Sequence, residues 1–330
     1  MAKQDNESDP FDVYGDHETQ ESVDDEAHVD LWTHQCTKNA GHLNYVDIDK
    51  LTLEDLPAAH RNDLFMNFVN SAAKLTIKIV VKMTSPNRPE FWPNSNKPFP
   101  SYKIRSRTNL RVGSGRIWRV TKYVDGIKGD GRKHCRAYTT CPCKKCRVSK
   151  TPSNTWWEIT VRTAAHVVYD EIEAEHASCT LFYDEKDSTV LTLDEITVPY
   201  INLDLDFARL TCYTCDPEVA GRLTQLQENF NALWGKMCEL NTEGVSDEDK
   251  CVFVISHPHG TPKKISFGQW KDKIAMTEHD YKFTYTAPTC PGSSGAPVFV
   301  LGYSGKSYYH VHSGALKSGL NISGADLVWA

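Results

Sequence analysis

Short stretches of apolar and polar residues in near alternation dominate the chain beyond residue 75 and predict strands. The first covers residues 75–83 and is rich in β-branched side chains. Further stretches are separated by Gly, Pro and Asp and cover residues 116–123, 156–162, 178–183, 251–255, 263–267, 282–286, 297–301 and 308–312. Because no helices alternate with these strands, the pattern predicts an all-β sandwich or barrel rather than a parallel α/β sheet.

Helical periodicity occurs at two places. Apolar residues recur at three- and four-residue spacings over 51–73, where Pro57 suits a helix start. A second helix is expected over 219–240, between two strand-rich halves. Residues 1–45 are acidic with few aliphatic side chains, so we expect a disordered tail. The predicted organisation is a tail (1–45), a helical adaptor (46–74) and a β domain (75–330) that divides into 75–215 and 216–330.

Charge is strongly polarised along the chain. The net charge is -6, but residues 1–30 hold eleven acidic residues and one Lys, whereas residues 102–150 hold fifteen basic and two acidic residues. The basic segment is predicted to contact a polyanion such as nucleic acid, or the acidic tail of the same chain. A solvated basic face without a partner is the alternative.

Two observations bear on the cellular setting. The longest apolar stretch, 75–83, is interrupted by Lys78 and Lys82, so no membrane span is expected. The acidic start of the chain lacks the basic and apolar regions of an export signal. We therefore expect a cytoplasmic or nuclear protein that is not secreted, with its eleven cysteines as reduced thiols or metal ligands.

A glycine-flanked serine near the carboxyl end is the first candidate for chemistry. In the segment 289–298, Gly292 and Gly295 surround Ser294 and permit a tight turn with an exposed hydroxyl. The backbone N–H groups of Gly292 and Ser294 would then form an oxyanion hole. By itself, a flexible polar turn has the same composition.

Two further segments add a base and an acid. His166 follows a predicted strand, behind two alanines that leave room beside its ring. Asp206 lies within an alternating apolar pattern, where a partly buried carboxylate needs a partner such as a histidine N–H. Asp204 is the competing acid, because residues two apart on a strand share one face.

These segments resemble the chymotrypsin-like serine peptidases, in their intracellular HtrA-type and viral forms. Thr163 to His166 match the family's Thr-Ala-Ala-His, residues 206–210 resemble its Asp-Ile-Ala-Leu-Leu, and residues 292–297 its Gly-Asp-Ser-Gly-Gly-Pro. The Val112-to-Ile117 segment, with Gly-Ser-Gly, and the Ser256-to-Gly260 turn are also similar to family motifs. The resemblance covers residues 75–330 and implies two six-stranded antiparallel β-barrels behind an N-terminal helical extension.

The resemblance also implies roles and a reaction. Ser294 would be the nucleophile, His166 the general base and Asp206 its orienting acid, in an intracellular serine endopeptidase that needs no catalytic cofactor. Residues 310–315 resemble the pocket strand of viral proteases, so that His312, with Ser313 and Gly314, would bind substrate and favour Glu or Gln at P1. The alternatives are a catalytically inactive protease fold whose basic, Cys-rich insert binds a protein or nucleic acid, and a non-peptidic acyl hydrolase.

A cysteine-rich insert at 124–155 is a candidate metal site. Cys141, Cys143 and Cys146 lie within six residues, with Cys135 or His134 available as the fourth ligand of a tetrahedral zinc. The pair Cys212 and Cys215 is an alternative completion of the shell. Such a zinc would be structural, and reduced thiols in an irregular loop are the other interpretation.

Overall fold

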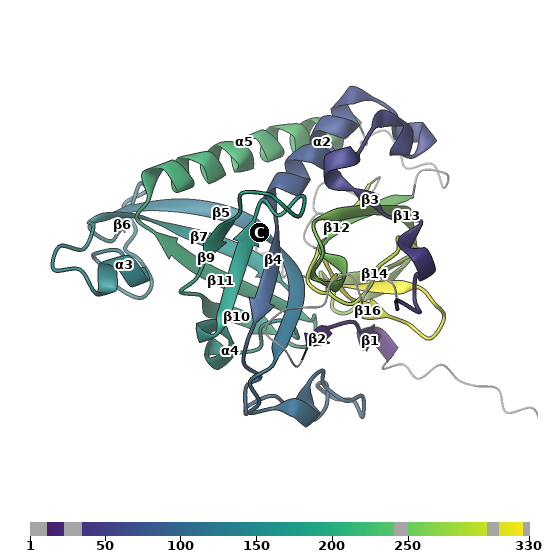
Figure 1. Ribbon diagram of the computed structural model, residues 1–330, viewed down its shortest axis with the longest axis horizontal. Coiled ribbons are helices and arrows are strands. Elements are labelled where there is room, and N and C mark those ends of the chain that lie inside the picture. Colours follow the sequence, from purple (N-terminus) through teal and green to yellow (C-terminus); the bar gives the residue numbers. More distant parts are fainter. Residues whose placement is uncertain (1–11, 23–34, 241–249, 302–309, 326–330) are drawn as a thin grey trace, which may run out of the picture.

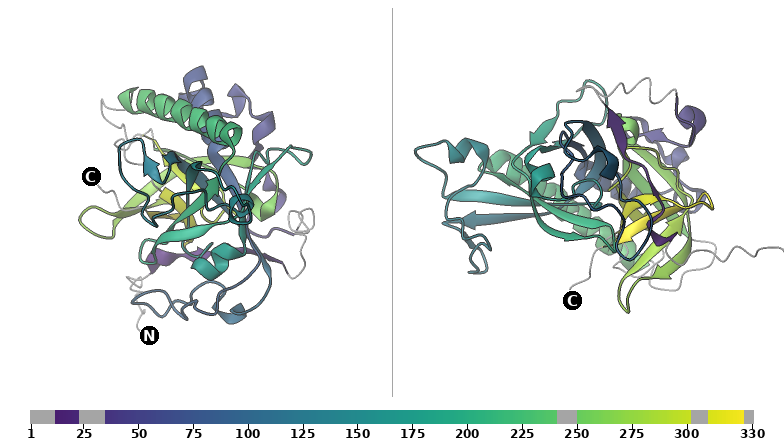
Figure 2. Two further views of the ribbon diagram at one scale, coloured as in Figure 1. Left: turned by 90° about the vertical axis from the view of Figure 1, so that its left-hand side faces the viewer. Right: turned by 90° about the horizontal axis from the view of Figure 1, so that it is seen from below.

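The computed structural model describes residues 12–22, 35–240, 250–301 and 310–325. Two antiparallel β-sheets stand side by side, and a helix lies along one side of the first of them (Figures 1 and 2). The predicted all-β fold with two antiparallel units is therefore confirmed, although only the second unit closes into a barrel among the described residues. Among the described residues no helix is both long and apolar enough to span a membrane.

The first sheet curls without closing. Its strands run in the order β10-β11-β7-β5-β4-β8-β9. They are β4 (Thr76–Val81), β5 (Leu110–Val124), β7 (Thr155–Thr163), β8 (Ala177–Leu181), β9 (Leu191–Leu193), β10 (Thr197–Asn202) and β11 (Phe207–Thr214), with β2 (Gln20–Ser22) and β6 (Ile127–Lys128) also paired to β5. The described residues contain no ladder between β9 and β10, so this unit is a half-barrel and not the closed six-stranded barrel expected. The end strand β9 has only three residues, too few to bridge that gap.

The second sheet closes on itself. The order β16-β15-β12-β13-β14-β17 is completed by a further pairing of β16 with β17, which gives the six-stranded barrel that was predicted. The strands are β12 (Cys251–Ser256), β13 (Lys264–Ala275), β14 (Tyr281–Tyr285), β15 (Pro297–Val300), β16 (His310–Ala315) and β17 (Asn321–Ala325), with β1 (Asp16–His17) on β16 and β3 (Val46–Asp47) on β13.

Helices join the two sheets. The helix α2 (Asp63–Leu75) begins where the Asn62 side chain accepts a hydrogen bond from the Phe65 N–H. It packs against α5 (Pro217–Leu240), with the Phe68 ring 5.5 Å from that of Phe230. Phe68 also meets Phe253 of the second barrel at 5.8 Å. The aromatic contacts of α2 thus hold both helices against the second barrel.

The first predicted helix starts later than its sequence pattern indicates. Residues before Asn62 form single turns instead, because Pro57 opens a short turn and not the helix itself. These turns are η3 (Ile48–Lys50), η4 (Leu53–Asp55) and η5 (Ala58–His60). The other short elements are η1 (Asp12–Tyr14), η2 (Ala40–His42), η6 (Tyr102–Ile104), η7 (Pro258–Gly260), α3 (Lys144–Arg147) and α4 (Glu171–Glu175).

The expectation of a disordered tail over 1–45 is wrong for the part that the structure describes. Residues 12–22 contribute β1 and β2, and residues 35–45 contribute η2. The composition argument failed because this segment does not build a core of its own. It pairs with the ends of β16 and β5 that neighbouring strands leave free on one side, so the ladder hydrogen bonds offset the cost of ordering.

Candidate active site

His166 and Asp206 meet because their strands are neighbours. His166 lies three residues beyond the end of β7, and Asp206 immediately precedes β11, which pairs with β7 in a register that places Ala208 opposite Thr163. The imidazole Nδ1 is 2.8 Å from Asp206 Oδ2, and the His166 backbone N–H donates to Oδ1 at 3.1 Å. Both side chains are fully buried. The competing acid, Asp204, is exposed.

The Asp206 carboxylate is held in its charged form. Burial by itself raises its pKa, but the charge and hydrogen bond of His166, the neighbouring His17 and the Ser313 hydroxyl lower it well below the usual range. Ser313 Oγ donates to Oδ2 at 2.5 Å. An ionised Asp206 accepts the Nδ1 proton, which leaves the His166 Nε2 lone pair free to act as a base.

Ser294 occupies a tight turn between β14 and β15. Gly292 and Gly295 have φ angles of 96° and 80°, in the left-handed region. A Cβ at Gly295 would lie 2.4 Å from the Ser114 carbonyl oxygen, so no larger residue fits there. Ser294 Oγ and His166 Nε2 are both buried without a hydrogen-bond partner among the described residues. The structure therefore joins His166 to Asp206 but shows no hydrogen bond between Ser294 and His166.

The Gly-Ser-Gly motif of β5 links the two loops. A Cβ at Gly113 would meet Val167 Cγ1 at 2.7 Å and the Ser294 carbonyl oxygen at 3.1 Å, so only glycine allows both loops to approach. The Ser114 N–H donates to the Ser294 carbonyl at 2.7 Å, and its hydroxyl donates to the Gly292 carbonyl at 2.9 Å. This explains why the motif belongs to the site and is not only a strand signal.

A buried ion network that the sequence did not reveal holds the histidine loop. Glu173 accepts two hydrogen bonds from the Arg88 guanidinium at 2.6 and 2.8 Å, and Arg111 contacts the same carboxylate at 2.8 Å. Both arginines also donate to backbone carbonyls of the loop, Arg88 to His166 at 2.9 Å and Arg111 to Val167 at 3.2 Å. The partners are far apart in sequence, and no local pattern marks them.

The predicted pocket histidine has a defined tautomer. The Tyr285 hydroxyl lies 2.6 Å from His312 Nδ1, and burial lowers the pKa of His312, so the neutral ring accepts from Tyr285 and carries its proton on Nε2. That Nε2 faces Glu18 Oε2 at 3.2 Å. Of the other predicted pocket residues, Ser313 binds Asp206, and Gly314 lies opposite His17 in the β1–β16 ladder.

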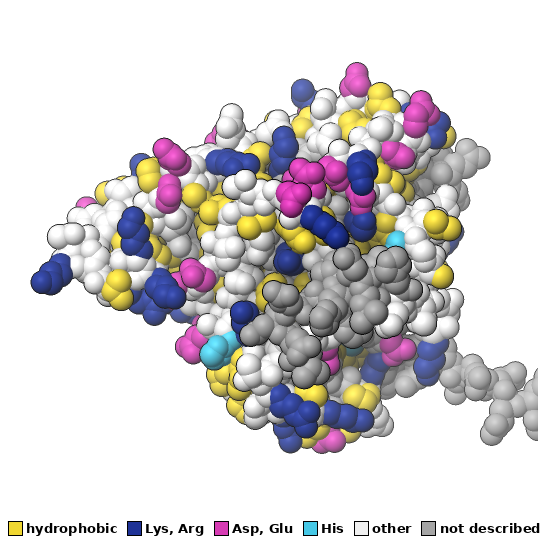
Figure 3. All heavy atoms as spheres, viewed as in Figure 1, with side chains coloured by type: hydrophobic (Ala, Val, Ile, Leu, Met, Phe, Trp, Pro, Cys, Tyr) yellow, Lys and Arg dark blue, Asp and Glu magenta, His cyan; other side chains and the backbone are white. Residues whose placement is uncertain are grey.

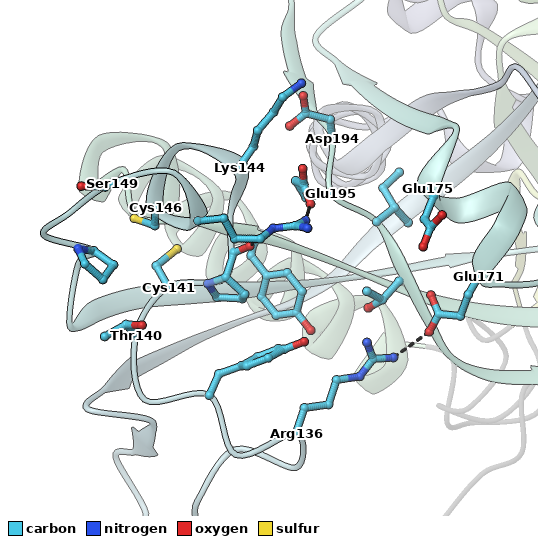
Figure 4. A pocket seen from close by; sticks show the side chains of 17 residues that line it. Arg136, Thr140, Cys141, Lys144, Cys146, Ser149, Glu171, Glu175, Asp194 and Glu195 are labelled. Atoms are coloured by element: carbon cyan, nitrogen blue, oxygen red, sulfur yellow. Dashed lines mark hydrogen bonds and ion pairs between the residues drawn. The ribbon is translucent and has the colours of Figure 1, made fainter.

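The cysteine cluster differs from the predicted one by a single residue. Cys141, Cys143 and Cys146 gather with Cys215, and their sulfur atoms all lie within 4.8 Å of one another. Cys135 is exposed and is not among them, so the prediction of Cys135 as the fourth ligand is wrong. Strand β11 carries Cys215 back to the insert, as the alternative pairing anticipated. Figure 4 shows the sulfur atoms of Cys141 and Cys146 side by side at one end of a pocket.

The basic insert carries pairs of opposite charge. Arg136 reaches Glu171 across the pocket at 2.7 Å (Figure 4), and Arg147 pairs with Glu195. Basic and acidic side chains share the visible surface around β6 and α3 (Figure 3). The described part of the N-terminal segment contacts the cleft between the two sheets and not the insert, which argues against that place for the predicted tail contact.

A second group of four donors lies beside the serine loop. Cys36 and His42 from the N-terminal segment face Cys290 and His259 of the second barrel, with their ligand atoms within 4.8 Å of one another. His42 Nε2 is 3.2 Å from His259 Nε2, and Cys36 Sγ is 3.5 Å from Cys290 Sγ. These residues tie the segment 35–45 to the protein body.

Comparisons with known proteins found one domain family and several solved structures that are similar to this chain. Residues 153–303 match the family model of the trypsin-like peptidase domain. No curated protein matches the chain. Solved structures similar to it include the HtrA-type protease AlgW with a decapeptide, at 13% identity and a TM-score of 0.38 over 78% of this chain. The match spans 63% of the AlgW chain.

Two other solved structures are similar at the same level. Deg5 has 11% identity and a TM-score of 0.40, with 82% of this chain and 91% of that chain covered. The Rv3671c protease from M. tuberculosis, in its active form, has 14% identity and a TM-score of 0.38, with 82% of each chain covered. Residues 153–303 of this chain are therefore similar to a trypsin-like peptidase domain, and the buried His166–Asp206 pair lies within that span.

Proposed function

We propose that this protein hydrolyses peptide bonds after glutamate, with Ser294 as nucleophile, His166 as general base and Asp206 as its orienting acid. One observation carries the specificity. Glu18 of the protein's own chain places its carboxylate against His312 Nε2 while its carbonyl oxygen accepts the Gly292 N–H at 3.0 Å. This is the arrangement required of a P1 residue, whose side chain fills the pocket and whose carbonyl lies in the oxyanion hole.

The pocket favours a carboxylate over an amide. Thr289 Oγ1 donates to Glu18 Oε2 at 3.0 Å, and Lys38 Nζ lies 2.5 Å from Oε1. Burial raises the pKa of Glu18, but the contacts with His312 and Lys38 lower it below its usual value. A charged P1 side chain therefore finds a donor for each oxygen, which supports Glu as the preferred residue and Gln as a weaker one.

The proposed reaction uses three side chains and one backbone N–H group. His166 Nε2 takes the proton of Ser294 Oγ as this oxygen attacks the scissile carbonyl, and the Gly292 N–H stabilises the oxyanion. Asp206 stabilises the imidazolium that forms. His166 then gives its proton to the leaving amine. The free thiols of the cysteines support a reducing compartment such as the cytoplasm for this activity.

A library of peptides varied at P1 tests the specificity. We expect Glu to exceed Ala in kcat/KM by about 10- to 100-fold, the worth of a hydrogen bond to a charged group. His312→Ala should remove that preference yet still label with a fluorophosphonate at Ser294, whereas the exposed control His279→Ala should behave as wild type. A Glu preference that survives in His312→Ala would contradict the proposed pocket, and a wild type that cleaves nothing and does not label would point to an inactive binding protein.

We also propose a structural zinc in the insert. In a tetrahedral Cys₄ site with Zn–S bonds of about 2.3 Å, sulfur atoms lie roughly 3.8 Å apart, and Cys143 Sγ is 3.9 Å from Cys215 Sγ. The donor set present thus fits zinc. Bound there, the metal would hold the insert to β11 and take no part in the triad.

Metal analysis with paired cysteine variants tests the zinc site. Cys215→Ser should lose about one equivalent of bound zinc relative to wild type, because three thiolates with one hydroxyl hold the metal far more weakly. The exposed Cys135→Ser should keep the full amount, although it lies in the same insert. Equal zinc contents in the two variants would remove Cys215 from the site.

A further inference from the structure

The N-terminal segment crosses the cleft between the two sheets in an extended form. On one side β1 pairs antiparallel with β16, with Asp16 opposite Ala315 and His17 opposite Gly314. On the other side β2 pairs antiparallel with β5, with Gln20 opposite Val112. The peptide bond between Glu18 and Thr19 lies between these two ladders. Figure 1 shows β1 and β2 where the two sheets meet.

From this geometry we propose that the protein cleaves its own chain between Glu18 and Thr19. The inference rests on the proposed endopeptidase function and adds the substrate on which it acts first. The cut occurs within one molecule, because the segment is already bound in its own cleft.

Residues before the bond are held as a substrate would be. The His17 ring lies 4.6 Å from the ring of His166 and 4.7 Å from Trp92, and its Nδ1 is 3.0 Å from the Ser313 carbonyl oxygen. The Tyr14 ring also stacks on the Trp92 ring, with the two ring centroids 4.6 Å apart. The main chain comes so close to β16 that a Cβ at Gly314 would lie 2.6 Å from the Asp16 carbonyl oxygen. Backbone pairing and side-chain pockets thus act together on this side.

At the bond itself, both the side chain and the carbonyl of Glu18 are fixed. The carboxylate has His312, Thr289 and Lys38 as partners, and the carbonyl oxygen accepts from Gly292. An acidic side chain that was bound but not positioned for cleavage would need only the contacts to its carboxylate. The additional hydrogen bond from Gly292 polarises the carbonyl that the nucleophile attacks.

Residues after the bond are anchored independently. Gln20 Oε1 lies 2.9 Å from His259 Nδ1. Further along, the Asn39 side-chain amide donates to the Thr289 carbonyl at 2.7 Å, and Lys38 Nζ donates to Asn321 Oδ1 at 2.9 Å. These contacts hold the downstream chain on the protein after cleavage, so the fragment released would be residues 1–18.

The step balances with water as the only co-reactant. Ser294 Oγ bonds to the Glu18 carbonyl carbon and gives its proton to His166; the C–N bond to Thr19 breaks, and the Thr19 nitrogen leaves as an amine with that proton. Water then attacks the acyl-enzyme and loses a proton to His166, which returns it to Ser294 Oγ. The products are a Glu18 carboxylate and a chain that begins at Thr19.

Cleavage also has a consequence for access. His166 and Ser294 have no exposed surface while the segment is in place. A peptide from outside reaches them only after residues 14–18 have left the cleft. The self-cleavage therefore precedes any action on other substrates.

Intact mass and amino-terminal sequencing of the purified full-length chain test the proposal. We expect wild type to convert to a chain starting at Thr19 plus a fragment of residues 1–18, at a rate that does not change on tenfold dilution. Ser294→Ala should stay intact, and Glu18→Ala should be cut about 10- to 100-fold more slowly. Glu54→Ala replaces an exposed glutamate elsewhere and should be cut as wild type. A rate that rises with protein concentration would overturn cleavage within one molecule.

Glu18→Lys separates failure of this inference from failure of the proposed function. Its cationic side chain cannot seat beside Lys38, so the cleft opens to an added peptide that copies residues 12–22. If Glu18→Lys cleaves that peptide after Glu while wild type remains intact, self-cleavage is overturned and the endopeptidase function stands. If neither protein cleaves either substrate, the proposed function fails as well.

Discussion

Asp206→Asn is expected to lower kcat for a Glu-containing peptide by about 10⁴-fold with little change in KM. The amide cannot take the place of the carboxylate, because its NH₂ group would face His166 Nδ1 and favour the tautomer with the proton on Nε2. That nitrogen could then no longer accept the Ser294 proton. The measurement is steady-state cleavage of a Glu peptide with both proteins in the Glu18→Lys background, because Asp206→Asn would also slow self-cleavage.

Asp204→Asn is the matched control for this experiment. Asp204 lies two residues earlier but is exposed, and among the described residues its side chain accepts only a long hydrogen bond, 3.5 Å, from the Tyr14 hydroxyl. We expect its kcat to remain close to that of wild type. If the two variants lost activity equally, the assignment of Asp206 over its neighbour would be wrong.

Glu173→Gln is expected to destabilise the protein by about 3–5 kcal/mol, because it leaves two buried guanidinium groups without their anion. Arg88 and Arg111 are 2% and 1% exposed, so water cannot replace the carboxylate. For a protein of this size the loss corresponds to a Tm lower by roughly 10 °C. Thermal unfolding of the Ser294→Ala background avoids interference from self-cleavage.

The pH dependence of stability provides a second test of the role of Glu173. Burial raises the pKa of Glu173, but Arg88 and Arg111 lower it from 4.5 to about 2. A depressed pKa adds stability above the unfolded value, and that stability is lost as pH falls from about 4.5 towards 2. Glu173→Gln should flatten this part of the curve. Glu171→Ala, which removes an exposed acid paired with Arg136, should change stability by less than about 1 kcal/mol, and a similar effect of both variants would refute the buried network.

Local sequence was sufficient for the elements that carry the triad. Three short motifs are involved, and each determines a turn or strand end within a few residues. They are the segment before His166, the segment that starts at Asp206 and the glycines around Ser294. The strand pattern likewise predicted the second barrel. The family resemblance, and not the strand pattern, implied that the first barrel closes; among the described residues this unit is a half-barrel, since local alternation marks strands but not which edges pair.

The ligands of the insert illustrate a different limit. Spacing alone grouped Cys135 with Cys141, Cys143 and Cys146, because these residues are close in the chain. The fourth thiol is Cys215, brought back by β11, 69 residues after Cys146. Proximity in sequence favours compact groups of cysteines, but strand pairing decides which sulfur joins the other three.

The sequence by itself predicted the resemblance to a peptidase family, the residues of the proposed triad and a candidate pocket histidine, because these depend on local backbone geometry and on side-chain chemistry. Only the tertiary structure decided that residues 16–22 fill the cleft, since the acidic composition of this segment predicts disorder. Its contacts with His312 and Gly314 span nearly 300 residues, and no pattern within the segment distinguishes Glu18 from the neighbouring acids. Antiparallel pairing with two separate sheets selects that one glutamate and brings its carbonyl to the Gly292 N–H.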